Sequence, residues 1–188
     1  MITDIFDRSI VKILTLFSIS PGSKFTRKEI KEKTMLYNIP LDKALTALLN
    51  NKILIKEKRF LSMNFENNNA KNVMEIIKKE YLRFKEIPLK IYYLLLDICA
   101  SLSAINQIEN IYLFGSFSKL IYTEKSDVDL GIILRRESKE LIKKIRSETS
   151  KIEKKYEKII EQHFFEKKDL SKKDHLIKEI KKNNVVLL

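Results

Sequence analysis

Residues 110–116 read Asn-Ile-Tyr-Leu-Phe-Gly-Ser, and residues 126–134 read Ser-Asp-Val-Asp-Leu-Gly-Ile-Ile-Leu. Each stretch contains an apolar run that predicts a buried β-strand. Because side chains alternate along a strand, Asp127 and Asp129 should project from one face while Val128 enters the core. Aspartate is disfavoured in strands. Two aspartates on one face of an apolar strand indicate a hard cation between them, normally Mg²⁺, although a solvent-facing turn and strand start would also place them there.

The end of the first stretch predicts a turn that binds phosphate. The chain has only three glycines, so each one indicates a position where the backbone needs conformational freedom. Gly115 would let the backbone approach a ligand closely, and Ser116 would begin a short helix whose amide end suits phosphate. Ser116 would equally serve as a helix N-cap, which is compatible with that role. A phosphate cradle facing a divalent metal is what phosphoryl or nucleotidyl transfer requires.

Together these features resemble a known superfamily. Leu-Phe-Gly-Ser at residues 113–116, a gap, and Ser-Asp-x-Asp-Leu at residues 126–130 are similar to the motif of nucleotidyltransferases such as DNA polymerase beta, antibiotic-modifying enzymes and minimal nucleotidyltransferases. The resemblance covers about residues 88–188, since residues 174–188 look like the helix-then-strand ending of many small members. It implies a domain that uses Mg²⁺ and an NTP, with ATP as first choice. The implied site residues are Asp127 and Asp129 for metal and catalysis, and Gly115, Ser116 and Lys119 for the nucleotide.

The chain departs from the family pattern in two places. Active members usually carry a third carboxylate on a later strand, which completes the metal site or acts as base. The later strand is expected over residues 158–165, and Glu161 is the candidate, although Glu161 and His163 would equally be polar residues on a half-exposed strand. Many members also have Arg-Gly where this chain has Lys119-Leu120. Lysine keeps the charge but loses the bidentate fork, and leucine removes the easy left-handed turn that glycine allows.

Residues 1–64 predict a different kind of module. Helices are expected over residues 4–18, 26–33 and 40–49, followed by short strands at residues 53–56 and 60–63. This order resembles a winged helix-turn-helix domain, whose third helix enters the DNA major groove while the hairpin contacts phosphate. Such domains also dock proteins. By the resemblance, the DNA-contacting residues are Lys43 and Thr46 in the third helix and Lys58 and Arg59 at the hairpin tip.

Residues 65–87 predict a helical connector, whose first helix would bridge the two modules. An exposed apolar stripe on this connector would equally form the seam of a homodimer. The chain is therefore expected to be α+β, with a winged helix-turn-helix at residues 1–64, the connector, and a nucleotidyltransferase domain with a mixed sheet at residues 88–188. In layout it resembles archaeal proteins that join these two modules.

Composition narrows the class of protein. The formal net charge of +12 favours nucleic acid or nucleotides as partners, although a Lys/Ile-rich proteome would produce the same charge. The single Cys99 excludes an intramolecular disulfide and a Cys-rich zinc site. The acidic start is not typical of a secretory signal, and no run reaches the roughly 18 apolar residues of a membrane span. We therefore expect a cytoplasmic protein without a membrane partner.

Three functions are consistent with these features. The leading one is a Mg²⁺-dependent nucleotidyltransferase that moves a nucleoside monophosphate from NTP to an acceptor hydroxyl, coupled to a DNA-binding module. The alternative is a DNA-binding transcriptional regulator whose second domain only binds nucleotide or dimerises. A second alternative is the antitoxin of a toxin–antitoxin pair. The acceptor, base preference, operator and oligomeric state do not follow from the sequence.

Overall fold

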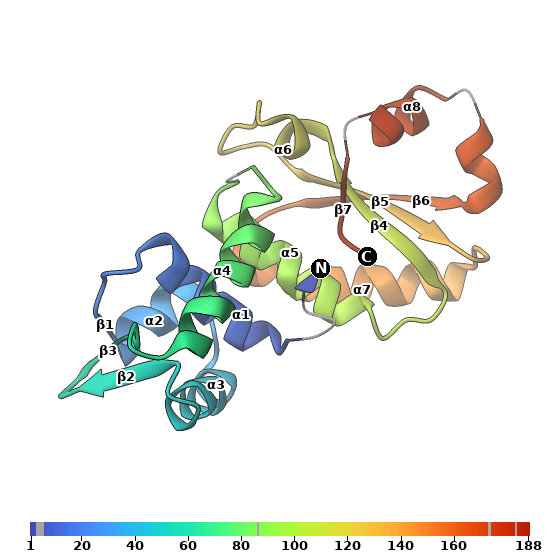
Figure 1. Ribbon diagram of the computed structural model, residues 1–188. Coiled ribbons are helices and arrows are strands. Elements are labelled where there is room, and N and C mark those ends of the chain that lie inside the picture. Colours follow the sequence, from blue (N-terminus) through green and yellow to red (C-terminus); the bar gives the residue numbers. More distant parts are fainter. Residues whose placement is uncertain (3–5, 86, 173, 183) are drawn as a thin grey trace. The chain divides into compact units, whose positions relative to one another are not determined.

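The computed structural model describes residues 1–2, 6–85, 87–172, 174–182 and 184–188 (Figure 1). Its contacts divide the chain into two compact units, Ile2–Glu86 on one side and Ile87–Leu188 with Met1 on the other. The helix predicted from residue 4 begins at Arg8, and residues 4 and 5 lie outside the described part of the chain. Residues 86 and 183, which fall in the predicted connector and the predicted terminal segment, lie outside it as well.

The first unit packs helices against a small antiparallel sheet. Thr26 and Glu29 form the capping box that the sequence predicted, since the Thr26 hydroxyl accepts from the Glu29 amide and the Glu29 carboxylate accepts from the Thr26 amide. The strand order is β1-β3-β2. The elements are α1 (Arg8–Ile19), β1 (Phe25–Thr26), α2 (Arg27–Thr34), α3 (Asn38–Asn50), β2 (Leu54–Glu57), β3 (Phe60–Met63) and α4 (Asn68–Leu82).

Helix α4 covers most of the segment expected to connect the modules. It packs along α1 inside the first unit and buries Ala70 and Ile77 completely, or nearly so. Helix α1 is buried along most of its length, with Val11, Ile13, Leu14 and Phe17 fully buried, so it needs a second helix to cover it. By its contacts, α4 therefore belongs to the first unit. In the predicted bridge, the apolar stripe of this helix would instead have faced solvent or a second copy of the chain.

The second unit is built on a four-stranded mixed sheet with the order β6-β5-β4-β7. Strands β5 and β6 run parallel, and β4 is antiparallel to both β5 and β7. This arrangement confirms the predicted α+β class with a mixed sheet. Its elements are α5 (Leu89–Leu102), β4 (Ile108–Phe114), α6 (Gly115–Lys119), β5 (Val128–Leu134), α7 (Lys139–Tyr156), β6 (Ile160–Glu166), the 3₁₀ turn η2 (Lys167–Ser171), α8 (His175–Lys182) and β7 (Val185–Val186).

The two faces of this sheet have different neighbours. Helices α5 and α7 lie on one face, where Gln162 of β6 donates to the hydroxyl of Thr149 in α7 at 2.7 Å (Figure 1). Helix α8 lies on the opposite face. The contact that shows this is at Gly131 of β5, where an added Cβ atom would lie 3.0 Å from the side chain of Ile180 in α8. The period of two then places the odd-numbered residues of β5 and β6, including Asp129 and Glu161, on the α8 face. Among the described residues, no helix is long and apolar enough to cross a membrane.

Candidate functional site

The last residues of β4 and the first residues of β5 and β6 lie at the same end of the mixed sheet, so residues that are distant in the sequence come together there. The antiparallel register places Phe114 of β4 opposite Asp129 of β5, so Gly115 follows directly beside that aspartate. The parallel register places Glu161 of β6 opposite Asp129 on its other side. Residues far apart in the sequence therefore surround a single carboxylate, and strand pairing rather than any local motif produces this arrangement.

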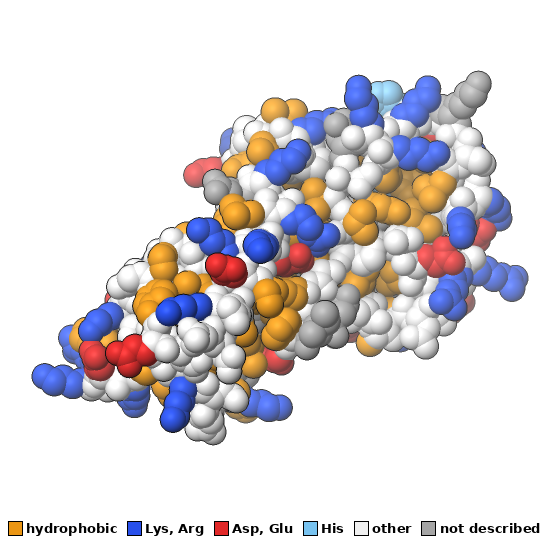
Figure 2. Space-filling model, viewed as in Figure 1, with side chains coloured by type: hydrophobic (Ala, Val, Ile, Leu, Met, Phe, Trp, Pro, Cys, Tyr) orange, Lys and Arg blue, Asp and Glu red, His pale blue; other side chains and the backbone are white. Residues whose placement is uncertain are grey.

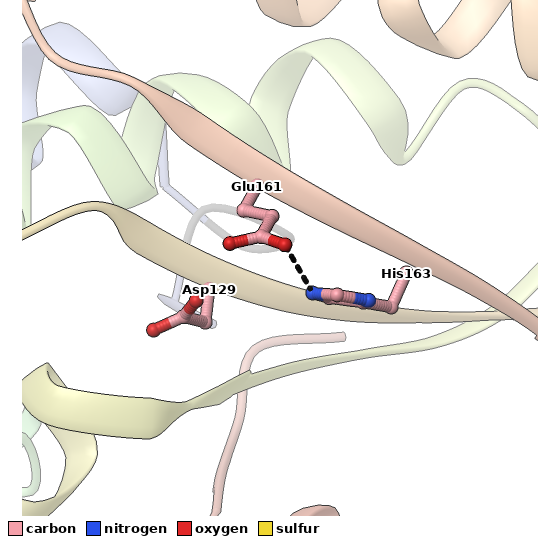
Figure 3. Close-up of side chains that lie close together, drawn as sticks. All are labelled: Asp129, Glu161 and His163. Carbon is pink, nitrogen blue, oxygen red and sulfur yellow. Dashed lines mark ion pairs between the residues drawn. The ribbon is translucent and has the colours of Figure 1, made fainter. Parts of the chain in front are cut away.

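A group of potential metal ligands lies at this edge (Figure 3). One ligand atom from each of Asp129, Glu161 and His163 lies within 4.8 Å of the others. The Nε2 atom of His163 is 3.3 Å from Oε1 of Glu161. The edge of the Phe114 ring contacts the imidazole, with ring centroids 5.4 Å apart. Two carboxylates and one imidazole in this geometry are able to hold a divalent cation.

The electrostatic environment of Asp129 also favours a cation. Burial raises the pKa of the Asp129 carboxyl above its ordinary value, and the negative charge of Glu161 raises it further. Asp127 and Glu179 add to the increase, and His163 opposes it. A partly buried carboxylate with other carboxylates nearby is costly to ionise. A cation bound between Asp129 and Glu161 would offset both the burial and the repulsion.

Gly115 brings backbone directly against the Asp129 carboxylate. Its φ is +70°, in the region that glycine adopts without strain. A Cβ atom at this position would lie 2.0 Å from Oδ2 of Asp129. Ser116 is half-buried inside α6 and is not its N-cap, since the helix begins at Gly115 with Phe114 as the capping residue. The backbone at Gly115 therefore approaches the Asp129 carboxylate closely, and its approach to a ligand stays a prediction. The capping role considered for Ser116 is wrong.

The Lys119-Leu120 departure has a structural outcome. Leu120 adopts the left-handed conformation, with φ 59° and ψ 30°, although a leucine pays about 1–2 kcal/mol for it. A left-handed turn that glycine would adopt without strain is thus formed here by a leucine. The ammonium of Lys119 forms an ion pair with Glu179 of α8. A phosphate group would have to compete with that carboxylate for the lysine.

Asp127 lies one residue before β5 and is not in the ligand group with His163. It lines a groove of about 510 Å³ that runs between α7 and the edge strand β6. Glu161 lines the same groove, so this glutamate is shared by the groove and the ligand group. The Oε1 atom of Gln162 is buried at the groove, and none of the described residues hydrogen-bonds to it. The other lining residues are Arg146, Ser150, Glu153, Ile159 and Ile160.

The four residues predicted to contact DNA are all exposed on the first unit: Lys43, Thr46, Lys58 and Arg59. Thr46 and Arg59 line one groove of about 560 Å³ between α3 and the β2–β3 hairpin, and Lys43 and Lys58 lie outside it. Figure 2 shows Lys and Arg side chains at the end of this unit where the hairpin turns. Arg27 is held by Asp42 of α3 through two bonds of 2.6 and 2.8 Å.

Two residues near the site were not predicted to take part in it. His163 was noted only as a polar residue beside Glu161, and the period of two along β6 was the signal that placed both on one face. Nothing in the sequence indicated that Glu179 lies near the site, because acidic residues are common on the polar face of an amphipathic helix. Its position beside Lys119 follows from α8 folding back over the sheet.

A family model described as a nucleotidyltransferase domain matches residues 94–187, which is half of the chain. The chain therefore belongs to the nucleotidyltransferase family, as the motif at residues 113–130 predicted. The matched region begins inside α5 and ends at β7, so it contains every residue of the ligand group and the Gly115 turn. A comparison with the curated proteins finds no match.

Proposed function

We propose that the second unit transfers a nucleoside monophosphate from an NTP, with ATP as the first choice, to a hydroxyl of an acceptor. The observation that carries this proposal is the position of Asp129, whose carboxylate lies between the Gly115 backbone and Glu161. A group of side chains that could hold a metal ion therefore lies against a backbone turn that has no room for a side chain at residue 115. Membership in the nucleotidyltransferase family supports the same chemistry.

The residues present fit a divalent ion such as Mg²⁺. The carboxylates of Asp129 and Glu161 are the oxygen ligands that hard cations take, and the raised pKa of Asp129 indicates a carboxylate that gains from a cation. Asp127 lies close enough to influence Asp129 electrostatically. When bound, the ion would neutralise charge on the triphosphate and polarise the phosphoryl group under attack.

The reaction itself is a displacement at the α-phosphorus. The acceptor oxygen forms a bond to that phosphorus while the bond to the bridging oxygen of pyrophosphate breaks, and pyrophosphate leaves with the electron pair. The hydroxyl proton goes to a carboxylate. Glu161 is the residue of the ligand group that also lines the α7–β6 groove with Asp127, so an acceptor lying in that groove would reach it.

The triphosphate would lie along the first turn of α6. Gly115 lets the backbone lie directly against the Asp129 carboxylate, and Ser116 follows it at the start of the helix. Lys119 would bind a phosphate oxygen after exchanging its partner Glu179. Because lysine is a point charge, this contact would contribute charge rather than the bidentate geometry of an arginine.

Calorimetric titration of Mg²⁺-NTPs into the purified protein tests the proposal, with the Asp127→Asn/Asp129→Asn variant beside it. We expect Mg²⁺-ATP binding that the double variant loses while it remains folded. Transfer of α-³²P label from ATP to cellular RNA or protein, with release of pyrophosphate, would then identify the acceptor class. Absence of binding for all four Mg²⁺-NTPs would refute the nucleotidyltransferase proposal.

We further propose that the first unit binds DNA as a winged helix-turn-helix. The order α1-β1-α2-α3-β2-β3 and the exposed Lys43 and Arg59 support this. The observation that favours a regulator without transfer activity is the ion pair of Lys119, which leaves the nucleotide site without a free lysine at this position. Operator binding should then fall steeply with salt and be lost in the Lys58→Ala/Arg59→Ala variant, while Asp127→Asn/Asp129→Asn keeps it. Retained DNA binding in the first variant would refute the wing contact.

A further inference from the structure

We propose that His163 is a ligand of the metal site, and that this site therefore takes a first-row transition ion such as Mn²⁺ in preference to Mg²⁺. The inference rests on the proposed function, because it concerns the same site. It differs from the all-carboxylate site expected from the sequence, in which Asp127 and Asp129 hold Mg²⁺.

Strand geometry brings the imidazole into the group. His163 follows Glu161 by two residues on β6, so both side chains project from the same face of the sheet. Its neighbour in the register on β5 is Gly131, which presents no side chain between the imidazole and Asp129. Figure 3 shows the imidazole and the Glu161 carboxylate directed toward each other, with Asp129 on the adjacent strand. All three ligand atoms lie within 4.8 Å of one another.

The ring is also held in place. Phe114 of β4 contacts the imidazole edge-to-face at a centroid distance of 5.4 Å, and Phe114 is itself buried. The His163 side chain is 25% exposed, whereas the Glu161 side chain is 56% exposed. A partly buried, packed imidazole loses little conformational freedom when it binds an ion, which favours its use as a ligand.

The donor set decides the metal. Mg²⁺ requires near-ideal octahedral oxygen coordination and gains little from nitrogen. Imidazole nitrogen favours first-row transition ions, and two carboxylates keep Mn²⁺ among the ions that the site accepts. Two oxygens and one nitrogen therefore select Mn²⁺ over Mg²⁺. The alternative is that His163 only hydrogen-bonds Glu161 and orients it, with no bond to the ion.

The chain offers a matched control, because it contains two histidines, His163 and His175. His175 is the exposed first residue of α8 and is not in the ligand group. The experiment is an electron paramagnetic resonance titration of Mn²⁺ into the full, untagged chain without nucleotide, followed by electron spin echo measurement of ¹⁴N coupling. Competition with Mg²⁺ gives the ratio of the two affinities.

We expect a ¹⁴N coupling in the wild type and in His175→Gln that is lost in His163→Gln. We also expect His163→Gln to weaken Mn²⁺ binding by about ten-fold or more while Mg²⁺ affinity changes little. His163→Asp, which supplies oxygen instead, should restore binding with the preference shifted toward Mg²⁺. Thermal unfolding of each variant in EDTA verifies that it is folded.

A wild-type protein that binds Mn²⁺ without ¹⁴N coupling would overturn the inference, and so would a coupling that persists in His163→Gln. Equal losses of Mn²⁺ and Mg²⁺ affinity in His163→Gln would also overturn it, because they indicate a residue that only orients Glu161. These failures are distinguishable from failure of the proposed function. Mg²⁺-ATP binding that survives them leaves nucleotidyl transfer standing, whereas metal binding without any nucleotide binding removes it.

Discussion

Replacing Gly115 with alanine tests how closely the backbone and the Asp129 carboxylate depend on each other. An alanine at φ +70° costs about 1–2 kcal/mol, because its Cβ is crowded in the left-handed region. That Cβ would lie 2.0 Å from Oδ2 of Asp129, whereas real contacts stay above 3.0 Å. The carboxylate therefore has to move by about 1 Å, which places the side chain off its rotamer at about 0.5–1.5 kcal/mol more.

The Asp129 carboxylate is able to move in only one direction, away from Gly115. Strand β5 is hydrogen-bonded on both sides, so its backbone stays in place and the Asp129 side chain turns away from Gly115. The ligand group with Glu161 is then disturbed. We expect a loss of about 2 kcal/mol in stability, or roughly 8–16 °C in the thermal midpoint of a unit of this size. We also expect metal binding to weaken.

The assay combines thermal unfolding by circular dichroism with calorimetric metal titration. Gly22→Ala is the control, since among the described residues no atom beyond its two chain neighbours lies within 4 Å of an added Cβ there. The Gly115→Ala/Asp129→Ala variant separates the two costs, because removing the carboxylate relieves the clash but not the backbone strain. If Gly115→Ala unfolds and binds metal as Gly22→Ala does, the close approach between Gly115 and Asp129 is wrong.

Three further predictions concern the same unit. Asp129→Asn should raise the urea midpoint of the metal-free protein at neutral pH. The pKa of the Asp129 carboxyl is raised in the folded chain above its ordinary 3.8, so the wild type loses stability as the pH rises from that value through the raised pKa. The neutral amide of asparagine removes this dependence on pH. Urea unfolding in EDTA between pH 4 and 8 checks it, and an unchanged pH slope contradicts it. Leu120→Gly should leave the free energy of unfolding unchanged or raise it by up to about 1 kcal/mol. Relief of the strain in the left-handed conformation offsets the greater conformational freedom of glycine in the unfolded chain. A clear loss of stability in urea unfolding would contradict this. Glu179→Gln should tighten Mg²⁺-ATP binding by up to about five-fold, since the partly exposed ion pair of Glu179 with Lys119 contributes about 0–1 kcal/mol. Calorimetry measures the affinity, and Glu124→Gln on the exposed loop before β5 is the control. Equal affinities in the two variants would rule out competition between Glu179 and the nucleotide for Lys119.

Local signals predicted the elements well where one periodicity dominates. The alternation around Asp127 and Asp129 identified β5, although Asp127 itself lies one residue before the strand. The spacing of Thr26 and Glu29 identified the start of α2. The strand with Glu161 was expected at residues 158–165 and lies at Ile160–Glu166. In each case the information is contained in a few neighbouring residues, so no distant partner is needed to read it.

Helix α4 shows where local signals are insufficient. Its apolar stripe is clear in the sequence, but a stripe does not identify the surface that covers it. The same pattern fits a bridge between modules, a dimer seam or a helix packed within one unit. The structure packs α4 against α1 within the first unit. Only the three-dimensional position of α1 distinguishes these outcomes.

By itself, the sequence determined the nucleotidyltransferase motif, the strand that carries Asp129 and the need for glycine at residue 115. The tertiary structure decided which side chains meet: Asp129 joins Glu161 and His163, Asp127 faces a groove, and Lys119 pairs with Glu179. The physical reason is that strand register and helix packing are set by the burial of the whole core. A one-residue slip of β6 would turn Glu161 and His163 to the other face, and no neighbouring residue encodes that choice.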